Sequence, residues 1–237
     1  RSLETPLLTN AANVTGFLNM LTAAKDAKVK RFVYASSSSV YGDNLKLHKV
    51  EDHIGDPLSP YAASKLVNEI YAGVYALNYG IQIIGLRYFN IFGPKQKPDG
   101  PYAAVIPLFM EALLKGESPY VNGDGEQSRD FTFVENAVQA NIRALFTEVA
   151  GATGKVYNIA YGERTTVNQL YFTLKDLVGS DVNPTYRAPR KGDVRDSLAD
   201  ISKARAYLGY DPEVDIRTGL DITLSWFKER FGKTVTG

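Results

Sequence analysis

The stretch RFVYASSSSVYG, residues 31–42, decides the fold of this chain. Phe32, Val33 and Tyr34 form a short apolar run, which predicts a buried strand. The serines at 36–39 follow directly, so they stand at the carboxyl end of that strand. In α/β proteins this edge of the sheet is where ligands bind. The stretch therefore predicts a sheet strand that ends in a binding site.

Predicted helices and strands alternate on both sides of this stretch. Before it, apolar residues recur at three- and four-residue steps from Pro6 to Lys28, which predicts one helix. After a polar loop at 42–59, Pro60 suits the first turn of a helix that reaches Tyr79, and a strand follows at 81–88. The next expected elements are a helix at 104–114, strands at 120 and 129–133, a helix at 135–147, a strand at 156–159, a helix at 167–177, a strand at 185 and two closing helices. This alternation indicates an α/β fold with a parallel sheet.

The composition is that of an ordinary globular protein, and it excludes several classes of function. The chain has 237 residues, 44% of them apolar, and a net charge of +1, so it has no general field for nucleic acid or an anionic membrane. No apolar run approaches the roughly 18 residues of a membrane span and no leader opens the chain, so we expect a cytoplasmic protein. There is no cysteine, and the only histidines are His48 and His53. Thiolate catalysis, a histidine triad and a metal site are therefore not expected.

Tyr61 and Lys65 stand four residues apart in the helix expected at 60–79, so both side chains leave the same face. An ammonium roughly 5 Å from a phenol favours the phenolate by about 3 kcal/mol. The pair can therefore make a general base. Such a pair alone is common on helix surfaces, where it contributes little. The position of this pair after the serine cluster favours a catalytic role.

Three motifs, taken in order, carry a resemblance to a known family. The serines at 36–39 come first, SPYAASK follows at 59–65, and RYFNIFG stands at 87–93. The chain resembles the extended short-chain dehydrogenase/reductase (NAD-dependent epimerase/dehydratase) family, whose pattern is a Ser or Thr, then Tyr-x-x-x-Lys, then Arg-x-Phe-Asn-x-Phe/Tyr-Gly. The likeness covers nearly the whole chain. It implies a partial Rossmann-type doubly wound parallel sheet with a small C-terminal substrate-binding lobe, and NAD as the cofactor.

The resemblance implies a role for each matching catalytic residue. Tyr61 matches the general base, and Lys65 matches the residue that orients the cofactor ribose and eases ionisation of the tyrosine. Ser37 matches the residue that hydrogen-bonds the reacting hydroxyl, and Ser38 or Ser39 can share that role. Standing alone, these serines would be read as a polar turn that closes a strand.

Further matches concern the cofactor and a nucleotide-sugar substrate. Asn13 and Tyr88 match residues beside the cofactor. Arg129 and Arg190 match a pair that grips the substrate pyrophosphate, a task suited to the planar guanidinium group. The full set that the resemblance assigns to a UDP-sugar is Asn90, Asn122, Arg129, Arg190, Asp193 and Ser197.

One part of the family pattern has no counterpart in this sequence. Family members open with a strand and a Gly-x-x-Gly-x-x-Gly turn, whose helix N-terminus binds the cofactor pyrophosphate. The sequence contains no such turn. We therefore expect residues 1–95 to form the C-terminal part of the NAD-binding domain without its glycine-rich half, and 96–237 to form mainly the substrate lobe, with segments near 125–160 returning to the sheet. On that expectation this chain alone binds NAD weakly and keeps affinity for UDP.

Ser38 and Ser39 favour one reaction within the family. Nucleotide-sugar 4,6-dehydratases carry Asp-Glu at this place, because elimination needs an additional acid and base near the sugar. Serines cannot supply them, so the resemblance points to a 4-epimerase. In that reaction Tyr61 takes the proton of the C4 hydroxyl, the 4-keto sugar turns, and the hydride returns from NAD to its other face.

The expected substrate is a UDP-N-acetylhexosamine or its uronic acid, used in surface-polysaccharide synthesis. The likeness is to bacterial 4-epimerases of such sugars. This resemblance implies that the position of Ser197 faces the C2 substituent of the hexose, where a serine leaves room for an acetamido group and a tyrosine would fill the space. Two alternatives stay open: a UDP-glucuronate epimerase or decarboxylase, and an inactive UDP-sugar-binding fragment. The resemblance also implies a homodimer through the helices that begin near Pro6 and Pro60, and neither a nucleic-acid nor a membrane partner.

Overall fold

The central sheet of the molecule has parallel strands. The computed structural model describes residues 2–98, 104–189 and 195–235. In it, β1 (Arg31–Ser37), β3 (Gln82–Tyr88) and β8 (Lys155–Ile159) form a three-stranded sheet in the order β1-β3-β8. The middle strand, β3, is buried from residue 83 to residue 87. The predicted α/β fold with a parallel sheet is thereby confirmed.

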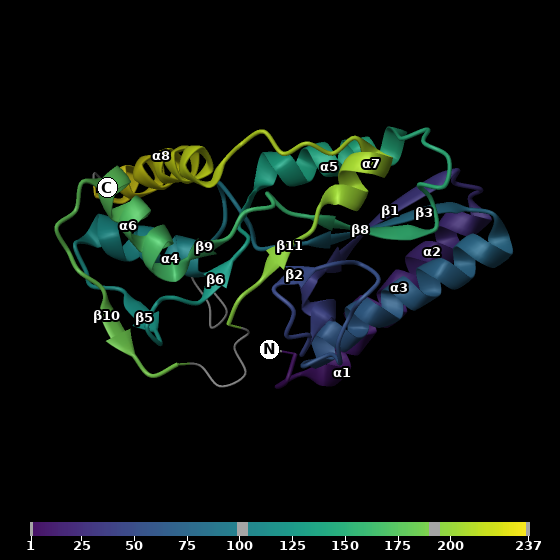
Figure 1. Ribbon diagram of the computed structural model, residues 1–237, viewed down its shortest axis with the longest axis horizontal. Helices are drawn as coiled ribbons and strands as arrows, with labels where there is room; N and C mark the ends of the chain where they lie inside the picture. Colours follow the sequence, from purple (N-terminus) through teal and green to yellow (C-terminus); the bar gives the residue numbers. More distant parts are fainter. Residues whose placement is uncertain (1, 99–103, 190–194, 236–237) are drawn as a thin grey trace.

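Helices cover both faces of this sheet, as in a doubly wound fold. The helices α3 (Pro60–Tyr79) and α5 (Val134–Phe146) each contact β1 and β3, and Figure 1 shows them on opposite sides of the strands. Arg31, at the start of β1, donates hydrogen bonds to the carbonyl oxygens of Leu145 and Thr147, 2.9 and 2.5 Å away. A cation is favourable there because the carbonyl groups at a helix C-terminus carry partial negative charge.

The long helix α3 has clear start and stop signals. The Ser59 side chain accepts a hydrogen bond from the N–H of Ala62 at 3.1 Å, and Pro60 takes the first helical position. At the other end, Gly80 adopts a left-handed conformation with φ 67, which ends the helix. The N-terminal signals fix the turn that carries Tyr61.

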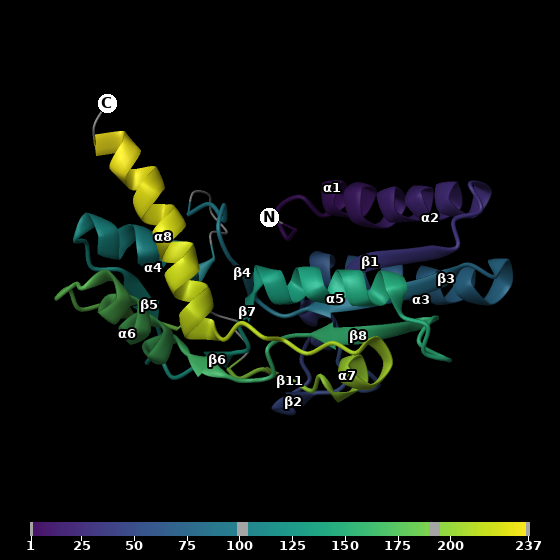
Figure 2. The same cartoon turned by 90° about the horizontal axis from the view of Figure 1, so that it is seen from above.

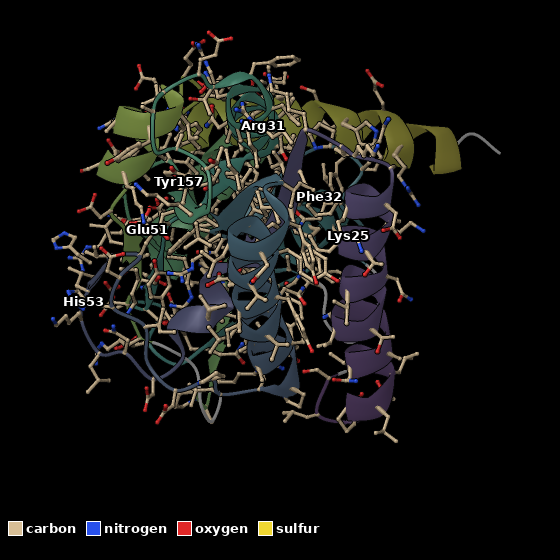
Figure 3. The ribbon with its side chains drawn as sticks, turned by 90° about the vertical axis from the view of Figure 1, so that its right-hand side faces the viewer. Lys25, Arg31, Phe32, Glu51, His53 and Tyr157 are labelled. Atoms are coloured by element: carbon tan, nitrogen blue, oxygen red, sulfur yellow. The ribbon has the colours of Figure 1, made fainter. Side chains whose placement is uncertain are left out.

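A second helix runs alongside α3 and contains a π-helical turn. The elements α1 (Pro6–Asn10), η1 (Ala11–Thr15) and α2 (Gly16–Asp26) follow one another without a break, in the range where the sequence predicts one helix. All three contact α3, and Figure 3 shows the two helices side by side. Asn13 lies in the π-helical turn, a local structure that often occurs at functional sites.

A second part of the structure is built from three helices around a separate apolar core. The helices α4 (Val105–Lys115), α6 (Val167–Val178) and α8 (Ile216–Val235) contact one another and lie together on the left of Figures 1 and 2. We call this part the lobe. Its core includes the buried side chains Phe109, Leu170 and Leu224. The strands β5 (Tyr120–Asn122) and β10 (Thr185–Arg187) pair in parallel within it.

Several pairs of two-residue strands connect the lobe to the sheet region. The pairs are β2 (His48–Lys49) with β11 (Leu198–Ala199), β4 (Ile91–Phe92) with β7 (Thr132–Phe133), and β6 (Ser128–Arg129) with β9 (Thr165–Thr166). The single strand predicted at 129–133 is wrong, because Asp130 and Phe131 separate β6 from β7 and the two pieces pair with different partners. Such short strands show no alternation of apolar and polar residues, so the sequence does not reveal them.

The remaining elements are η2 (Ser38–Tyr41), which follows β1, and α7 (Ser202–Leu208). The helix α7 contacts β8 and α5, so the chain returns to the sheet before it enters the lobe again at α8. Within the described residues, no helix is long and apolar enough to cross a membrane.

Candidate active site

Tyr61 and Lys65 lie close together near the end of β1. The Lys65 Nζ atom is 5.7 Å from the centre of the Tyr61 ring and donates a hydrogen bond to the carbonyl oxygen of Ala35, 2.9 Å away. Because Ala35 belongs to β1, this bond ties the lysine to the strand that carries the serines. Burial lowers the pKa of Lys65, since a low dielectric disfavours the ammonium form. A cation held beside an accessible phenol is an arrangement that can activate a general base.

Tyr61 borders an open cavity of about 800 Å³. The cavity is lined by residues from the first helix and from the start of α3: Ser2, Thr5, Leu8, Thr9, Ala12, Asn13, Ser59 and Tyr61. Tyr61 is 38% exposed, so its hydroxyl can be reached from solvent. The phenol is thus open to a ligand while Lys65 is held against the sheet.

The serines after β1 have different environments. Ser37 is the last residue of β1, stands opposite Tyr88 in the pairing with β3, and accepts a hydrogen bond from the N–H of Ser39 at 3.2 Å. Ser38 opens the short helix η2. The Ser39 hydroxyl is buried and has no hydrogen-bond partner among the described residues. Of the three, Ser37 lies on the sheet edge beside Tyr88.

The Asn13 side chain is hydrogen-bonded to α3. Its Nδ2 donates to the Ser64 hydroxyl at 3.0 Å, and that hydroxyl donates to the carbonyl oxygen of Tyr61 at 2.7 Å. These two bonds tie the π-helical turn of the first helix to the turn that holds Tyr61. The sequence singles out Asn13 through the family motif, but it gives no reason to single out Ser64.

Tyr88 is anchored to the opposite face of the sheet. Its hydroxyl lies 3.0 Å from Oδ1 and 2.7 Å from Nδ2 of Asn141, a residue of α5. Burial raises the pKa of Tyr88, so its phenol stays neutral over a wide pH range. Asn141 belongs to no motif, and only the packing of α5 on the sheet reveals it.

A buried polar network supports the edge of the sheet, and Arg87 is its centre. The Arg87 guanidinium donates to the two carboxylate oxygens of Glu69 at 2.9 and 2.7 Å, to the Tyr41 hydroxyl at 3.1 Å and to the carbonyl oxygen of Glu51 at 2.9 Å. The Ser36 hydroxyl also donates to the Glu69 carboxylate. Ser36 therefore faces this network, unlike the serines that follow it. The sequence motif contains Arg87 but does not reveal Glu69 as its partner.

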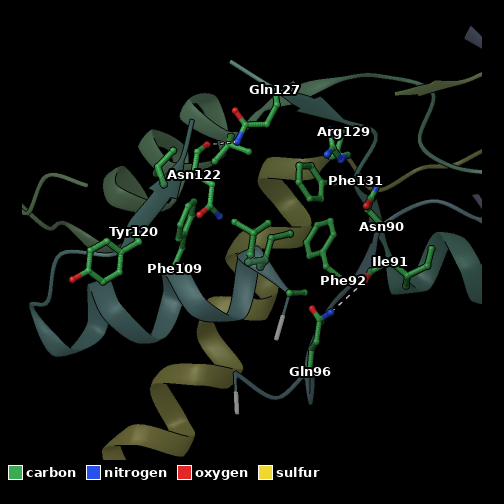
Figure 4. Close-up of a pocket in the computed structure, with 15 residues that line it drawn as sticks. Asn90, Ile91, Phe92, Gln96, Phe109, Tyr120, Asn122, Gln127, Arg129 and Phe131 are labelled. Carbon is green, nitrogen blue, oxygen red and sulfur yellow. Dashed lines mark hydrogen bonds between the residues drawn. The ribbon is translucent and has the colours of Figure 1, made fainter. Parts of the chain in front are cut away.

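A second cavity, of about 330 Å³, lies in the lobe, and its size falls within the usual range for small-molecule sites. Asn90, Asn122 and Arg129 line it, so the structure brings together three of the residues expected to bind substrate. Figure 4 shows them together with aromatic side chains of the same wall, among them Phe92, Phe109, Tyr120 and Phe131. An apolar wall with a few polar groups suits a ligand that has both a flat ring and charged oxygens.

The two asparagines of this cavity are fixed by hydrogen bonds. Asn90 adopts a left-handed conformation with φ 38, and its Nδ2 donates to the carbonyl oxygen of Asp130 at 2.9 Å. The Oδ1 of Asn122 accepts from Nε of Arg187 at 2.7 Å, and its carbonyl oxygen accepts from Nε2 of Gln127 at 2.7 Å. Arg187 and Gln127 were missed from the sequence: Arg187 reaches Asn122 through the pairing of β5 with β10, and Gln127 reaches it across the turn after β5.

Arg129 and Ser197 are both held next to Ser128. The Nη1 of Arg129 donates to the carbonyl oxygen of Ser128 at 2.8 Å, and the N–H of Ser197 donates to the same oxygen at 3.2 Å. Ser197 is half-buried there and is not among the residues that line the 330 Å³ cavity. Arg190 and Asp193, the other two residues expected to bind substrate, lie outside the described residues.

Comparison with known proteins agrees with this arrangement. The model of the NAD dependent epimerase/dehydratase family matches residues 1–160, a range that contains Tyr61, Lys65 and the serines after β1. The chain belongs to this family. NAD is the cofactor that the family uses, and solved structures similar to this chain are complexes with NAD.

Individual relatives cover most of the chain. A putative UDP-glucose 4-epimerase of Methanocaldococcus jannaschii is 38% identical over 228 residues, which is 96% of this chain and 72% of that protein. The structure of a UDP-N-acetylglucosamine 4-epimerase from Methanobrevibacter ruminantium, in complex with UDP-N-acetylmuramic acid, is 40% identical with a TM-score of 0.92, and the match covers 97% of this chain and 73% of that one. The structure of a UDP-glucuronic acid 4-epimerase from Bacillus cereus, in complex with UDP-glucuronic acid and NAD, is 31% identical with a TM-score of 0.85, and covers 93% and 68%.

Proposed function

We propose that the protein interconverts the two C4 epimers of a UDP-sugar with the help of NAD. The observation that carries this proposal is the pairing of Tyr61 with Lys65 next to the serine edge of β1, in a chain whose relatives are named as 4-epimerases of UDP-sugars. When bound, NAD supplies the site that takes up a hydride and gives it back.

Each catalytic side chain has a defined task in this reaction. Tyr61 takes the proton of the C4 hydroxyl as the C4 hydrogen leaves as hydride to the cofactor, and a 4-keto sugar results. Ser37 holds the C4 oxygen by a hydrogen bond. After the 4-keto sugar turns in the site, the hydride would return to the opposite face of C4, and Tyr61 would give its proton back to the C4 oxygen. Protons and electrons therefore balance, and the cofactor is unchanged.

The described residues around Tyr61 fit part of a dinucleotide. The cavity there is open and has polar groups from Thr9, Asn13 and Ser59 on its wall. The ammonium of Lys65 has three donors, of which the bond to Ala35 uses one, so the others can reach the ribose hydroxyls. The glycine-rich turn that binds the pyrophosphate in this family does not occur in the sequence. The residues at hand thus suit the nicotinamide and its ribose.

For the substrate we propose a UDP-N-acetylhexosamine or its uronic acid, used in surface-polysaccharide synthesis. Ser197 has a small side chain and is hydrogen-bonded through its N–H to the carbonyl oxygen of Ser128, next to Arg129 of the cavity wall. The similarity to a UDP-N-acetylglucosamine 4-epimerase at 40% identity supports this choice.

A second candidate is the 4-epimerisation or decarboxylation of UDP-glucuronate, and the similarity to the Bacillus cereus 4-epimerase favours the epimerisation. A third is a protein that binds a UDP-sugar without turnover. The first experiment is therefore to supply the natural protein that carries this chain with NAD and, separately, UDP-N-acetylglucosamine, UDP-glucose or UDP-glucuronate. Chromatography of the products should show the C4 epimer of the N-acetylated sugar. Conversion of UDP-glucuronate alone would favour the second candidate, and binding without any product the third.

We also propose that two copies associate through α1–α2 and α3. These helices lie side by side, and several of their apolar side chains are exposed: Leu7, Met20, Ile70, Val74 and Leu77. An exposed apolar surface of this kind, spread over two adjacent helices, is typical of a protein interface. A two-fold axis would bring the same helices of both copies together.

A further inference from the structure

The carboxylate of Asp130 is completely buried, and its hydrogen-bond partners are backbone N–H groups. Asp130 is 0% exposed and lies between β6 and β7. Its oxygens accept from the N–H of Tyr161 at 3.1 Å, of Gly162 at 3.2 and 3.3 Å and of Ala199 at 3.3 Å. Among the described residues, no lysine or arginine forms an ion pair with it. A buried charge costs free energy unless such bonds compensate it, so its presence calls for an explanation.

The donors come from two segments that are distant in sequence. Tyr161 and Gly162 follow β8, at the end of the central sheet, and Ala199 belongs to β11. Gly162 has φ 89, a conformation that other residues rarely adopt, and this allows its N–H to reach the carboxylate. Asp130 therefore joins the edge of the sheet, the strand β11 and the β6–β7 connection at a single side chain.

Three candidate substrate residues depend on this junction. Arg129 directly precedes Asp130, and its Nη1 donates to the carbonyl oxygen of Arg195 at 3.0 Å. Ser197 stands two residues before Ala199, and its N–H donates to Ser128 at 3.2 Å. A bond from the N–H of Ser128 to Arg195 at 2.9 Å completes the pairing of the two segments.

Asn90 is held by the backbone of Asp130. Its side chain donates to the carbonyl oxygen of Asp130 at 2.9 Å, and its own carbonyl oxygen accepts from the N–H of Thr132 at 3.2 Å. Asn90 and Arg129 both line the 330 Å³ cavity. Asp130 thus contacts or adjoins two cavity side chains, Asn90 and Arg129, that come from different parts of the chain.

We propose that Asp130 is a positioning residue for the nucleotide-sugar, whose buried carboxylate holds the segment 195–199 and the β8–β9 connection against β6 so that Arg129, Asn90 and Ser197 face one ligand. The proposal rests on the proposed function, because it assigns these residues to a UDP-sugar. Asp130 does not touch the ligand. An asparagine in its place has the same shape but only one acceptor oxygen, and its NH₂ group would face an N–H donor.

The test compares the UDP affinity of the unaltered chain with the UDP affinities of Asp130→Asn and of a matched control, Asp211→Asn. Asp211 is exposed, pairs with Arg205 at 3.5 Å on the surface, and lies outside the cavity. Titration calorimetry should show a loss of affinity of about 10-fold or more for Asp130→Asn, as expected when a buried acceptor is replaced by a donor and N–H groups lose their partner, and no change for the control. Equal affinity of Asp130→Asn and the parent would overturn the proposal while the assigned UDP site stands.

A double variant separates positioning from general stability. If Asp130 acts through Arg129, then Asp130→Asn combined with Arg129→Ala should bind UDP little worse than Arg129→Ala alone. Additive losses would show that the two residues act independently, which contradicts the proposal. A purely structural role would lower the unfolding temperature and leave the affinity of the folded protein unchanged.

Amide hydrogen exchange covers the cases in which the variant does not fold or UDP does not bind. In the unaltered chain, UDP should slow exchange at Gly162 and Ala199, and unchanged rates at a saturating concentration would count against the proposal. Without ligand, Asp130→Asn should speed exchange at Ser197, whereas Asp211→Asn should not. If the unaltered chain binds no UDP, the assigned substrate class is wrong, and the ligand-free exchange at Ser197 still decides whether Asp130 holds this segment.

Discussion

The guanidinium of Arg87 lies 2.7 Å from the carboxylate of Glu69, and the two side chains are only 4% and 8% exposed. This ion pair joins β3 to α3, four residues beyond Lys65 along the helix. Ser36, immediately before Ser37, donates to the same carboxylate. The pair therefore fixes the sheet edge relative to the helix turns that carry the candidate catalytic residues.

Removal of one member of this pair should strongly destabilise the protein. Glu69→Gln leaves the Arg87 charge buried without its counterion, which typically costs about 3–5 kcal/mol. The control is Asp176→Asn, which breaks an exposed pair of similar length, 2.6 Å from Arg217, and should cost about 1 kcal/mol or less. Urea unfolding measures both changes. Similar losses of unfolding free energy in the two variants would show that the buried ion pair stabilises the protein no more than the exposed one.

Replacement of the proposed base should abolish most of the turnover. In an active form of the protein, Tyr61→Phe removes the hydroxyl that accepts the C4 proton and should lower kcat at least roughly 100-fold. Substrate affinity should change little, because the ring remains. Tyr79→Phe is a matched control, since Tyr79 lies at the far end of the same helix and is 53% exposed. If Tyr61→Phe turns over at nearly the parental rate, Tyr61 is not the base.

Asp130 should make the stability of the protein depend on pH in a defined direction. Burial raises the pKa of this carboxyl to about 7, although backbone N–H groups favour its ionised form. An unfolded aspartate titrates near about 3.9, so the folded protein holds this proton more tightly. Its contribution to stability is then fully present below about pH 4 and is lost as the pH rises through about 7.

Asp130→Asn has no proton to lose at this position. The stability of the parent relative to this variant should therefore fall between about pH 4 and 7, by at most about 1.4 kcal/mol per pH unit. Urea unfolding at several pH values gives both curves. A constant difference between them would mean that the carboxyl does not titrate in this range.

The local signals in the sequence were enough to predict the sheet and its main helix. The apolar run before Ser36 gives β1, and α3 runs from Pro60 to Tyr79 in the structure, as predicted. The four-residue spacing of Tyr61 and Lys65 likewise sets which helix face they share, because helix geometry is regular. These features depend on neighbours in sequence, so they can be read from it.

Features that depend on tertiary pairing could not be predicted. The partners of Tyr88 and Arg87, namely Asn141 and Glu69, come from helices whose packing the sequence does not specify. The break at Asp130 was missed because the residues around it look like one strand, and only the competing partners β4 and β9 divide it. The burial of the Asp130 carboxylate could not be predicted either, because nothing in the local sequence indicates which N–H groups will face it.

The proposed dimer predicts that a charge on the exposed helix face will separate two copies. Leu77 of α3 is 85% exposed in the single chain, so Leu77→Lys should not disturb its fold. Sedimentation at tens of micromolar should show a dimer for the parent and a monomer for the variant. Leu45→Lys is the control, because Leu45 is 99% exposed and belongs to the loop after η2 rather than to these helices. A monomeric parent would contradict the proposal.

The substrate assignment rests on Ser197, and its replacement tests the sugar. Ser197 follows Asp196, whose carboxylate accepts from the Ser128 hydroxyl at 2.5 Å, so the segment is fixed and cannot easily yield to a larger side chain. In an active form of the protein, Ser197→Tyr should crowd an acetamido group at C2 of the sugar, and such overpacking typically costs about 1–3 kcal/mol, or roughly a 5- to 150-fold loss in kcat/KM. UDP-glucose has only a hydroxyl at C2, so its kcat/KM should fall far less. Ser197→Ala is the matched control and should leave the ratio of kcat/KM for the two substrates unchanged, because it removes the hydroxyl without adding bulk. Equal losses on both sugars with Ser197→Tyr would mean that this residue does not sense the acetamido group, and the choice of an N-acetylated substrate would lose its main support.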